Sequence, residues 1–335
     1  MPSTIKYCPT QAGRVAYSTA GSGPPLFLDS GWVTHLHRQL DLFSFRAFHS
    51  RLAERFTVVR YDKPGCGLSE RDGADLSFEA QVTAAMAVAD ALRLSRFAMF
   101  GASQGGHIAA AIAARHPDRI TSLVLYGTCA DGAELAPKEV RESLVSLVRA
   151  HWGLGSRMMT TIFVPEPTAA EQETFTRLQR EGATAAVASE LLRIYYETDV
   201  TGLLPRIRAR TAVLHREADT AARFQLGQKV ARLVPDAGLV PLPGSGHLFY
   251  QGEWEAVLDA AMGFLTGGPE TSPVLTSREL QVAKLVAEGL TNHAIATRLS
   301  VAPRTAETHV ENIRRKLQVR SRAQIAAWVS GQAGR

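Results

Sequence analysis

The chain has 335 residues, of which 45% are hydrophobic and 21% charged, a composition typical of a folded globular protein and not of a disordered one. Its net charge of +5 is uneven, because residues 274–335 hold ten basic and four acidic residues and leave 27 basic and 28 acidic residues before them. A small basic region behind a neutral body predicts contact with nucleic acid, although a solvated helix face would carry the same charge.

The first residues, MPSTIKYCPTQ, lack the apolar core of a secretory signal, and no apolar run reaches the roughly 18 residues that span a bilayer. Three cysteines, Cys8, Cys66 and Cys129, have no metal-ligand spacing and are expected to be free thiols. We therefore expect a cytoplasmic protein with no membrane contact, no metal and no other cofactor.

Residues 1–267 are predicted to form one α/β domain. Helix-like stretches at Ser77–Leu92, Gly105–His116 and Phe224–Leu233 separate short apolar segments that read as strands. The predicted strands are 25–30, 56–62, 97–103, 122–127, 211–215 and 238–244. This alternation predicts a mostly parallel sheet covered by helices on both faces. The alternation lapses at about 131–204, which is too long for an ordinary loop and is predicted to be a helical lid over the carboxyl ends of the strands.

The segment Gly101-Ala102-Ser103-Gln104-Gly105 follows a predicted strand and opens a predicted helix. Glycines two residues before and two after the serine allow a sharp turn that leaves the serine Oγ exposed above the sheet. The amino end of the helix favours negative charge that develops at this point. Ser103 is therefore the candidate nucleophile.

A nucleophilic serine needs a base, and the base needs an acid that orients it. His247, in LPGSGHLFY, lies on a glycine-flanked loop after the last predicted strand, and Asp219 follows the strand before it. The chain order Ser103, Asp219, His247 suits this architecture. Two weaker candidates are His215, inside a strand, and Asp131, at the entrance to the lid.

Residues 5–266 resemble the α/β-hydrolase superfamily. The segment YDKPGCGLSE matches its D-x-x-G-x-G-x-S turn, and FLDSGWV stands where most members carry His-Gly. The resemblance implies an oxyanion hole formed by the backbone N–H groups of Trp32 and Gln104. Ser30 replaces the usual histidine, and Arg216 replaces the glycine that commonly follows the strand bearing the acid. These two departures lead us to expect weak or vestigial turnover.

A linker is predicted at 268–273, because Gly268, Pro269 and Pro273 break any helix. Residues 274–335 are then predicted to form a small all-α domain of four short helices. Thr276 or Ser277 caps the first helix and Gly289 ends it; Thr291 caps the second, Pro303 begins the third and Ser321 caps the fourth. Two of these helices joined by the short turn SVAP form a helix-turn-helix, whose second member enters the major groove of DNA.

The third helix predicts the DNA-contacting residues. Ala306, Val310, Ile313 and Leu317 recur at helical spacing and should be buried. Arg304, Thr305, Glu307, Thr308, Glu311 and Asn312 face elsewhere, and Arg315 and Lys316 follow in a basic cluster near the end of the helix that suits phosphate. A generic helical bundle is the alternative.

The tail resembles the LuxR-type (GerE-type) regulatory domain, through Leu275-Thr276, Arg278-Glu279, Ile295-Ala296, His309, Lys316-Leu317 and Arg322 among others. The resemblance adds Asn292 to the DNA-binding candidates and implies double-stranded DNA as a partner and a homodimer. Together, the two resemblances predict a transcription factor whose hydrolase-derived domain senses a small acyl, ester or lactone ligand. The alternative is a true esterase or lactonase that carries a DNA-binding tail.

Overall fold

A computed structural model of the chain describes residues 4–267, 275, 277–299, 301–317, 319 and 321–333. The chain divides into two compact units, Met1–Leu265 and Thr266–Arg335. The predicted linker at 268–273 lies outside the described residues, as does the proposed cap Thr276. No helix in the described ranges is long and apolar enough to cross a membrane.

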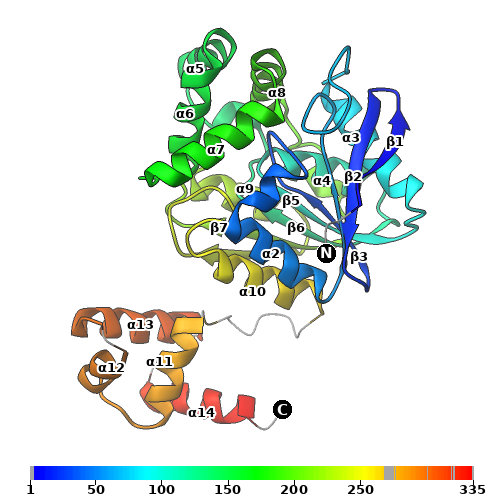
Figure 1. The fold of residues 1–335 in the computed structure, drawn as a ribbon. Coiled ribbons are helices and arrows are strands. Elements are labelled where there is room, and N and C mark those ends of the chain that lie inside the picture. Colours follow the sequence, from blue (N-terminus) through cyan, green and yellow to red (C-terminus); the bar gives the residue numbers. More distant parts are fainter. Residues whose placement is uncertain are drawn as a thin grey trace. The chain divides into compact units, whose positions relative to one another are not determined.

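The first unit is built on an eight-stranded sheet of order β1-β2-β4-β3-β5-β6-β7-β8 (Figure 1). Its strands are β1 (Lys6–Thr10), β2 (Gly13–Ala20), β3 (Pro25–Asp29), β4 (Thr57–Tyr61), β5 (Phe97–Ala102), β6 (Ile120–Tyr126), β7 (Arg210–Arg216) and β8 (Gly238–Leu242). From β4 to β8 all neighbours are parallel, whereas β2 runs antiparallel to both β1 and β4. The α/β fold and the six predicted strands are confirmed, and the hairpin β1–β2 is an addition.

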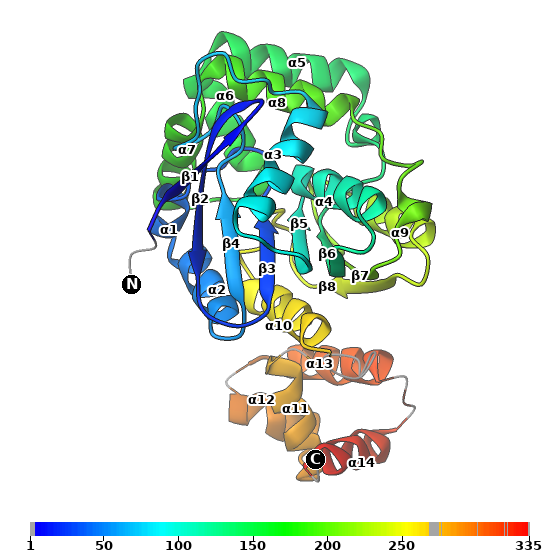
Figure 2. The same ribbon diagram turned by 90° about the vertical axis from the view of Figure 1, so that its right-hand side faces the viewer.

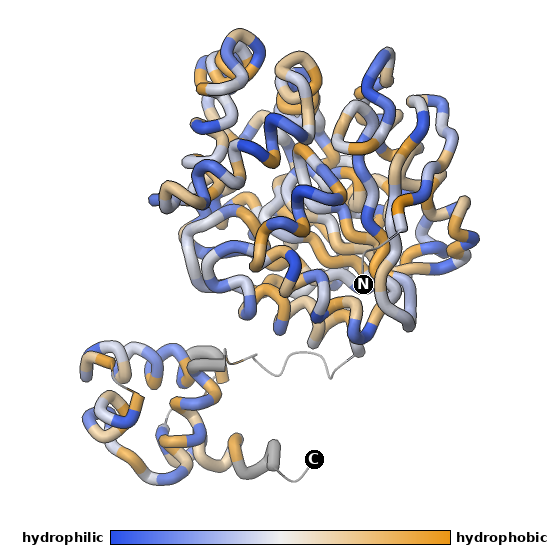
Figure 3. Tube along the Cα trace, viewed as in Figure 1, coloured by the Kyte–Doolittle hydropathy of each residue, from blue (hydrophilic) through white to orange (hydrophobic). Residues whose placement is uncertain are grey.

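Helices cover both faces of this sheet (Figure 2). One face packs against α3 (Phe78–Ala91), α4 (Gln104–Arg115) and α9 (Phe224–Leu233), and the other against α2 (Phe43–Ala53) and α10 (Trp254–Leu265). Alternate residues of the same strand enter different cores, as Phe27 and Leu28 do in β3, because successive side chains of a strand point to opposite faces. The hydrophobic residues accordingly concentrate along the strands (Figure 3).

The predicted lid is helical. Between β6 and β7 the chain forms α5 (Lys138–Ala150), α6 (Trp152–Phe163), α7 (Ala169–Gly182) and α8 (Ala185–Glu197), flanked by the 3₁₀ turns Gly132–Glu134 and Leu204–Arg206. In Figure 2 these helices lie together beyond the carboxyl ends of β3 and β4. The short helix α1 (Arg38–Asp41) precedes α2 and contacts α7.

The second unit contains α11 (Ser277–Ala287), α12 (Asn292–Leu299), α13 (Pro303–Lys316) and α14 (Arg322–Ala333). Thr291 Oγ accepts the N–H of Ala294 at 3.2 Å and Ser321 Oγ that of Gln324 at 3.3 Å, so both predicted caps are present. Gly289, with φ of +85°, ends α11 in the left-handed conformation that glycine favours. The predicted small helical domain is confirmed.

Candidate functional site

Ser103 lies on a sharp turn between β5 and α4. Its φ of 53° is unusual for a residue other than glycine. A Cβ on Gly101 would lie 2.5 Å from the carbonyl oxygen of Gly105, and a Cβ on Gly105 would lie 2.4 Å from Asp29 Oδ1. The two glycines are therefore required by close contacts on both sides of the serine.

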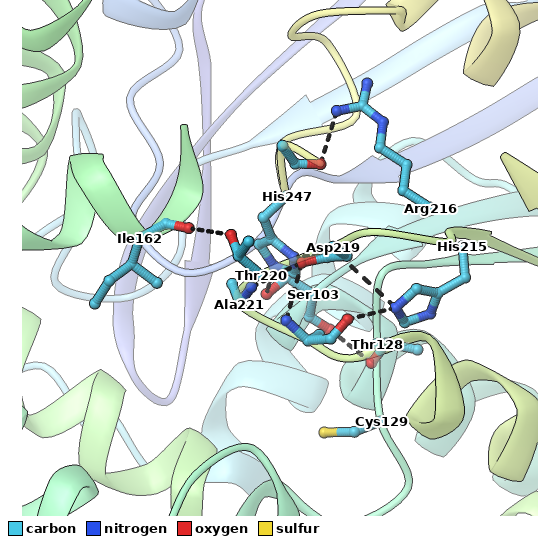
Figure 4. A network of polar contacts seen from close by, with 12 residues as sticks. Ser103, Thr128, Cys129, Ile162, His215, Arg216, Asp219, Thr220, Ala221 and His247 are labelled. Atoms are coloured by element: carbon cyan, nitrogen blue, oxygen red, sulfur yellow. Dashed lines mark hydrogen bonds and ion pairs between the residues drawn. The ribbon is translucent and has the colours of Figure 1, made fainter. Parts of the chain in front are cut away.

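The structure brings Ser103, His247 and Asp219 together from three loops at the carboxyl ends of β5, β8 and β7 (Figure 4). His247 Nε2 lies 2.9 Å from Ser103 Oγ, and His247 Nδ1 lies 2.9 Å from Asp219 Oδ2. The other oxygen of Asp219 accepts the N–H groups of Ala221 and Ala222 at 2.9 and 3.0 Å. Burial alone would raise the pKa of Asp219, but the adjacent His247 and these donors lower it below its ordinary value. This geometry suits a serine activated by a histidine that an ionised carboxylate orients.

The two weaker candidates lie elsewhere. His215 is buried behind Asp219, with Nε2 2.7 Å from the carbonyl oxygen of Ala222 and 3.8 Å from Asp219 Oδ2. Burial lowers the pKa of His215, so its ring stays neutral and supports the acid from behind. Asp131 accepts the N–H of Ala133 at 2.9 Å and so caps the first turn of the lid.

The loop after β3 places Trp32 beside the nucleophile turn. A Cβ on Gly31 would lie 3.5 Å from the carbonyl oxygen of Ala102 and 3.7 Å from Ser103 Cβ, so the backbone before Trp32 passes close to that turn. Gln104 is the first residue of α4, where a backbone N–H has no partner within the helix. Ser30, in the position of the usual histidine, accepts a hydrogen bond from Gln39 Nε2 at 2.7 Å, so this departure leaves the loop anchored.

Four main-chain carbonyls of the lid hold the residues around Ser103. On α6, Ile162 accepts from Thr220 Oγ at 3.2 Å and Phe163 accepts the N–H of His247 at 2.8 Å. On α8, Ala188 accepts from the Trp32 indole at 3.1 Å and Leu191 from the Gln104 side chain at 3.2 Å. A displacement of α6 or α8 would therefore disturb the base, the acid loop or the proposed oxyanion hole.

Arg216, read from the sequence as a departure, supports the loop that carries His247. Its side chain, labelled in Figure 4, is fully buried, and it donates to the carbonyl oxygen of Gly246 at 2.7 Å and to that of Gln251. The Arg216 side chain, at the end of β7, thus fixes the loop that carries His247 to the strand that precedes Asp219. The sequence showed an unusual residue here, but not where its guanidinium points.

We expect Arg216→Met to lower the free energy of unfolding of the first unit by about 2 kcal/mol, because two partly buried carbonyls lose a charged donor. The quantity is measured by urea unfolding. Arg223→Met, at an exposed position, is the matched control and should change it by less than about 0.5 kcal/mol. Equal values for the two variants would contradict this role of Arg216.

The turn that contains Asp62, Gly67 and Ser69 holds the loop after β3, which carries Trp32 and Leu36. Asp62 Oδ2 accepts the N–H groups of Leu36 at 3.1 Å and Leu68 at 2.8 Å. A Cβ on Gly67 would lie 2.1 Å from this oxygen, which explains the glycine. Burial raises the pKa of Asp62 from 3.8 to about 6, although the two N–H donors and Arg60 oppose the rise.

A raised pKa means that the folded state holds the proton of Asp62 more tightly than the unfolded chain. Its contribution to stability is thus complete below pH 4 and is lost as the pH rises through 6. Between pH 4 and pH 7 we expect the wild type to lose about 2 kcal/mol relative to Asp62→Asn, whose amide oxygen can still accept both N–H groups. Urea unfolding across this pH range measures the difference. Asp72→Asn, at an exposed position, is the control and should follow the wild type; parallel pH curves for all three proteins would contradict the prediction.

Within the described residues, no group of three or more His, Cys, Asp or Glu side chains could hold a metal ion. Cys8, Cys66 and Cys129 are free and buried. Burial raises the pKa of Cys66 and of Cys129 to about 12, so both thiols stay protonated.

Helix α13 presents the predicted polar face. Ala306, Val310 and Ile313 are buried and Leu317 is partly buried, as expected. Exposed on the opposite side are Arg304, Thr305, Glu307, Thr308 and Glu311, with Asn312 partly exposed. Glu311 forms an ion pair with Arg314 at 3.1 Å. The side chains of Arg315 and Lys316 lie outside the described part of the chain.

Asn292, at the start of α12, is engaged within its own unit. Its side-chain oxygen accepts a hydrogen bond from Arg322 Nη1 at 2.6 Å, and Nη2 of the same arginine donates to the carbonyl oxygen of Leu290. This pair of contacts fixes the start of α14 to the start of α12. Asn292 therefore helps to position these helices, and its contact with DNA stays a prediction.

Two known families match the chain. Residues 24–251 match the family described as alpha/beta hydrolase fold, and residues 273–329 match the bacterial regulatory proteins of the luxR family. The first match covers the strands β3 to β8, the lid, and Ser103, Asp219 and His247. The second covers α11 to α13 and most of α14.

Curated relatives and solved structures resemble the first unit. A pimeloyl-[acyl-carrier protein] methyl ester esterase from Chromobacterium violaceum is 30% identical over 251 residues, 68% of this chain and 89% of that protein. A 2-hydroxy-6-oxononadienedioate/2-hydroxy-6-oxononatrienedioate hydrolase from Burkholderia vietnamiensis is 28% identical, over 70% of this chain and 80% of its own. The enol-lactonase from Burkholderia xenovorans superposes with a TM-score of 0.65 at 23% identity, over 78% of this chain and 100% of its own. The last likeness concerns the fold alone.

Proposed function

Because the chain belongs to the alpha/beta hydrolase fold family and carries a luxR-family domain at its carboxyl end, we propose that it is a transcriptional regulator that senses a small acyl, ester or lactone ligand. Residues 1–267 form the sensing domain, 268–273 the linker and 274–335 the domain that binds double-stranded DNA. The observation that carries the proposal is the presence, in one chain, of the Ser103–His247–Asp219 arrangement and a helix-turn-helix with a polar exposed face. The methyl ester esterase among the relatives supports an ester as the ligand class.

The site supports acyl transfer, and its slow rate is part of the proposal. His247 accepts the proton of Ser103 as Oγ attacks the carbonyl carbon, and Asp219 holds the imidazole in orientation. The backbone N–H groups of Trp32 and Gln104 stabilise the oxyanion. His247 then returns the proton to the leaving oxygen, and water releases the acyl group by the same steps in reverse.

The lid is the element through which a ligand acts on the rest of the chain. Because α6 and α8 hydrogen-bond to Thr220, His247, Trp32 and Gln104, a ligand bound at Ser103 meets the lid and the reactive groups together. A ligand shifts the lid only by its difference in affinity for the two lid positions. That shift changes the affinity of the chain for DNA.

The proposed DNA contacts come from α13 and the start of α12. They are Asn292, Arg304, Thr305, Glu307, Thr308, Glu311, Asn312, Arg315 and Lys316. Glu307 and Glu311 would repel phosphate and are therefore placed at base edges, where a carboxylate accepts from cytosine N4. A single helix-turn-helix reads few base pairs, so we propose a homodimer on two half-sites, with Trp328 of α14 as a contact residue, whereas Ile325 of the same helix is buried in the core of its own unit.

The proposal is tested by selecting genomic fragments that bind the full chain and then titrating aryl esters and lactones against the DNA affinity. We expect paired half-sites about one helical turn apart and an affinity that changes with at least one ligand class. If compounds of the panel bind at Ser103 but none of them changes the DNA affinity, the proposal that the first domain is a sensor is wrong.

A true esterase or lactonase is the second candidate, and the 2.9 Å contacts on both sides of the His247 ring favour it. A multiple-turnover assay on the same panel separates the two. Fast turnover with DNA affinity that is independent of the substrate supports the enzyme. Slow turnover with a ligand-dependent affinity supports the regulator.

A further inference from the structure

An aromatic cluster borders the proposed base. The Phe163 ring stacks on the imidazole of His247, with centroids 5.5 Å apart and planes inclined by 30°. Phe163 also meets Trp32 edge-on at 6.0 Å, and Trp32 meets Trp152 edge-on at 5.9 Å. Trp32, Trp152 and Phe163 are called the aromatic wall below.

Two elements build the aromatic wall. Trp152 and Phe163 are the first and last residues of α6, a separation of about three helical turns that places both on one face of the helix. Met159, on the same face between them, is buried in the cluster that contains Trp32. Trp32 comes from the loop after β3 and also offers its backbone N–H to the proposed oxyanion hole. The aromatic wall therefore joins the lid to both reactive sides of the site.

The polar atoms of the aromatic wall are already engaged. The Trp32 indole N–H donates to the carbonyl oxygen of Ala188 at 3.1 Å, and that of Trp152 donates to Ala183 at 2.9 Å. The hydrophobic lid residues of the same cluster include Ala183, Leu191 and Leu192. A ligand that meets the three rings therefore meets ring surface, and both indole N–H groups are already bonded to lid carbonyls.

We propose that the aromatic wall is the leaving-group subsite of the Ser103 centre and selects an uncharged alcohol portion that carries an aromatic ring. The inference rests on the proposed function, since it takes Ser103 and His247 as the acyl-transfer pair. Ser103 Oγ bonds to the carbonyl carbon, the bond from that carbon to the ester oxygen breaks, and the alcohol leaves with the proton that His247 carried. The alcohol portion must therefore lie beside His247, where Phe163 is. A ligand ring extends the edge-to-face arrangement, which is more favourable than burial of equal aliphatic area.

The test measures binding of benzyl acetate and cyclohexylmethyl acetate to the full-length Ser103→Ala protein, which cannot be acylated at this position. The two esters share the acyl group and are similar in size, and differ in whether the ring is aromatic. We expect benzyl acetate to bind about fivefold more tightly. Calorimetry gives the affinities, and quenching of tryptophan fluorescence reports contact with Trp32 or Trp152. Equal affinities for the two esters would overturn the proposal.

Substitution of the aromatic wall should remove the preference. In the Ser103→Ala background, Phe163→Leu and, separately, Trp152→Leu are expected to bring the affinity ratio close to one. Phe43→Leu, at a position on α2 that is 73% exposed, should leave the ratio unchanged. A ratio that survives both Phe163→Leu and Trp152→Leu would also overturn the proposal. The binding measurements do not involve DNA, so the two proposals can fail separately. A preference for benzyl acetate without ligand-dependent DNA binding would show that the regulator proposal is wrong. Ligand-dependent DNA binding without that preference would show that the leaving-group proposal is wrong.

Discussion

Replacing Ser103 by alanine is expected to abolish hydrolysis and to preserve ligand-dependent control of DNA binding. Without Oγ no acyl intermediate forms, and loss of a serine nucleophile lowers kcat by about 10⁴-fold or more. The lid contacts made by Trp32, Gln104, Thr220 and His247 do not involve the Ser103 side chain, so the ligand can still displace the lid. The measurement is a multiple-turnover assay with the ester that changes the DNA affinity most, together with a titration of the DNA affinity with the same ester.

The matched control is Ser143→Ala, at an exposed position of α5 where the hydroxyl bonds only to its own helix, to the carbonyl oxygen of Glu139. It should leave both activity and ligand response at wild-type values. If Ser103→Ala takes up the ligand, remains folded and no longer responds, hydrolysis itself is the signal and the sensor-without-turnover proposal is wrong.

DNA binding by the chain is expected to weaken by about a thousandfold between 50 and 200 mM salt. The basic excess of the whole protein lies in residues 274–335, and cations that neutralise phosphates release counterions from DNA. The affinity of the full chain, and of a fragment from Glu270 to Arg335, is measured across this salt range. An affinity that does not depend on salt would contradict phosphate contact.

Arg315→Ala should reduce the slope of log affinity against log salt by about one, because one phosphate contact is lost. The effect should be similar for all DNA sequences, since a phosphate contact carries no base information. Arg51→Ala is the matched control, because Arg51 is an exposed arginine of α2 in the other unit and its slope should equal that of the wild type. An unchanged slope in Arg315→Ala would show that this arginine does not meet the backbone of DNA.

The hairpin β1–β2 marks the limit of the strand pattern. The strands β3 to β8 could be predicted from the sequence, because β3 to β7 are buried on both faces and form continuous apolar runs, and β8 is apolar although partly exposed. Strand β1 contains Pro9 and exposed polar residues and gave no such signal. The sheet tolerates Pro9 because β1 is an edge strand, and an edge position is a property of the assembled sheet.

Ser103, Asp219 and His247 could be predicted from the sequence because their order and their positions after strands follow from the fold. A serine between two glycines after a strand, an acid after β7 and a histidine after β8 all lie at strand ends, and parallel strands bring those ends to one edge. Among the weaker candidates, His215 and Asp131 carry equally suitable side chains. Only the distances, 2.9 Å from His247 to Asp219 and 3.8 Å from His215 to Asp219, decide which histidine lies between the acid and the serine.

What the sequence by itself determined is local or periodic: the two domains' fold classes, the turn at Ser103, the helix caps Thr291 and Ser321, and the buried stripe of α13. What the tertiary structure decided is where long side chains and lid carbonyls meet. In the sequence Arg216 departs from the usual glycine and predicts weak turnover, whereas in the fold its guanidinium fixes the loop that carries His247. The contact of Asn292 with DNA stays a prediction, and only the fold shows that its amide oxygen also accepts a hydrogen bond from Arg322. Such contacts join residues 30 positions apart, and their geometry depends on how whole elements pack, which no local pattern of residues encodes.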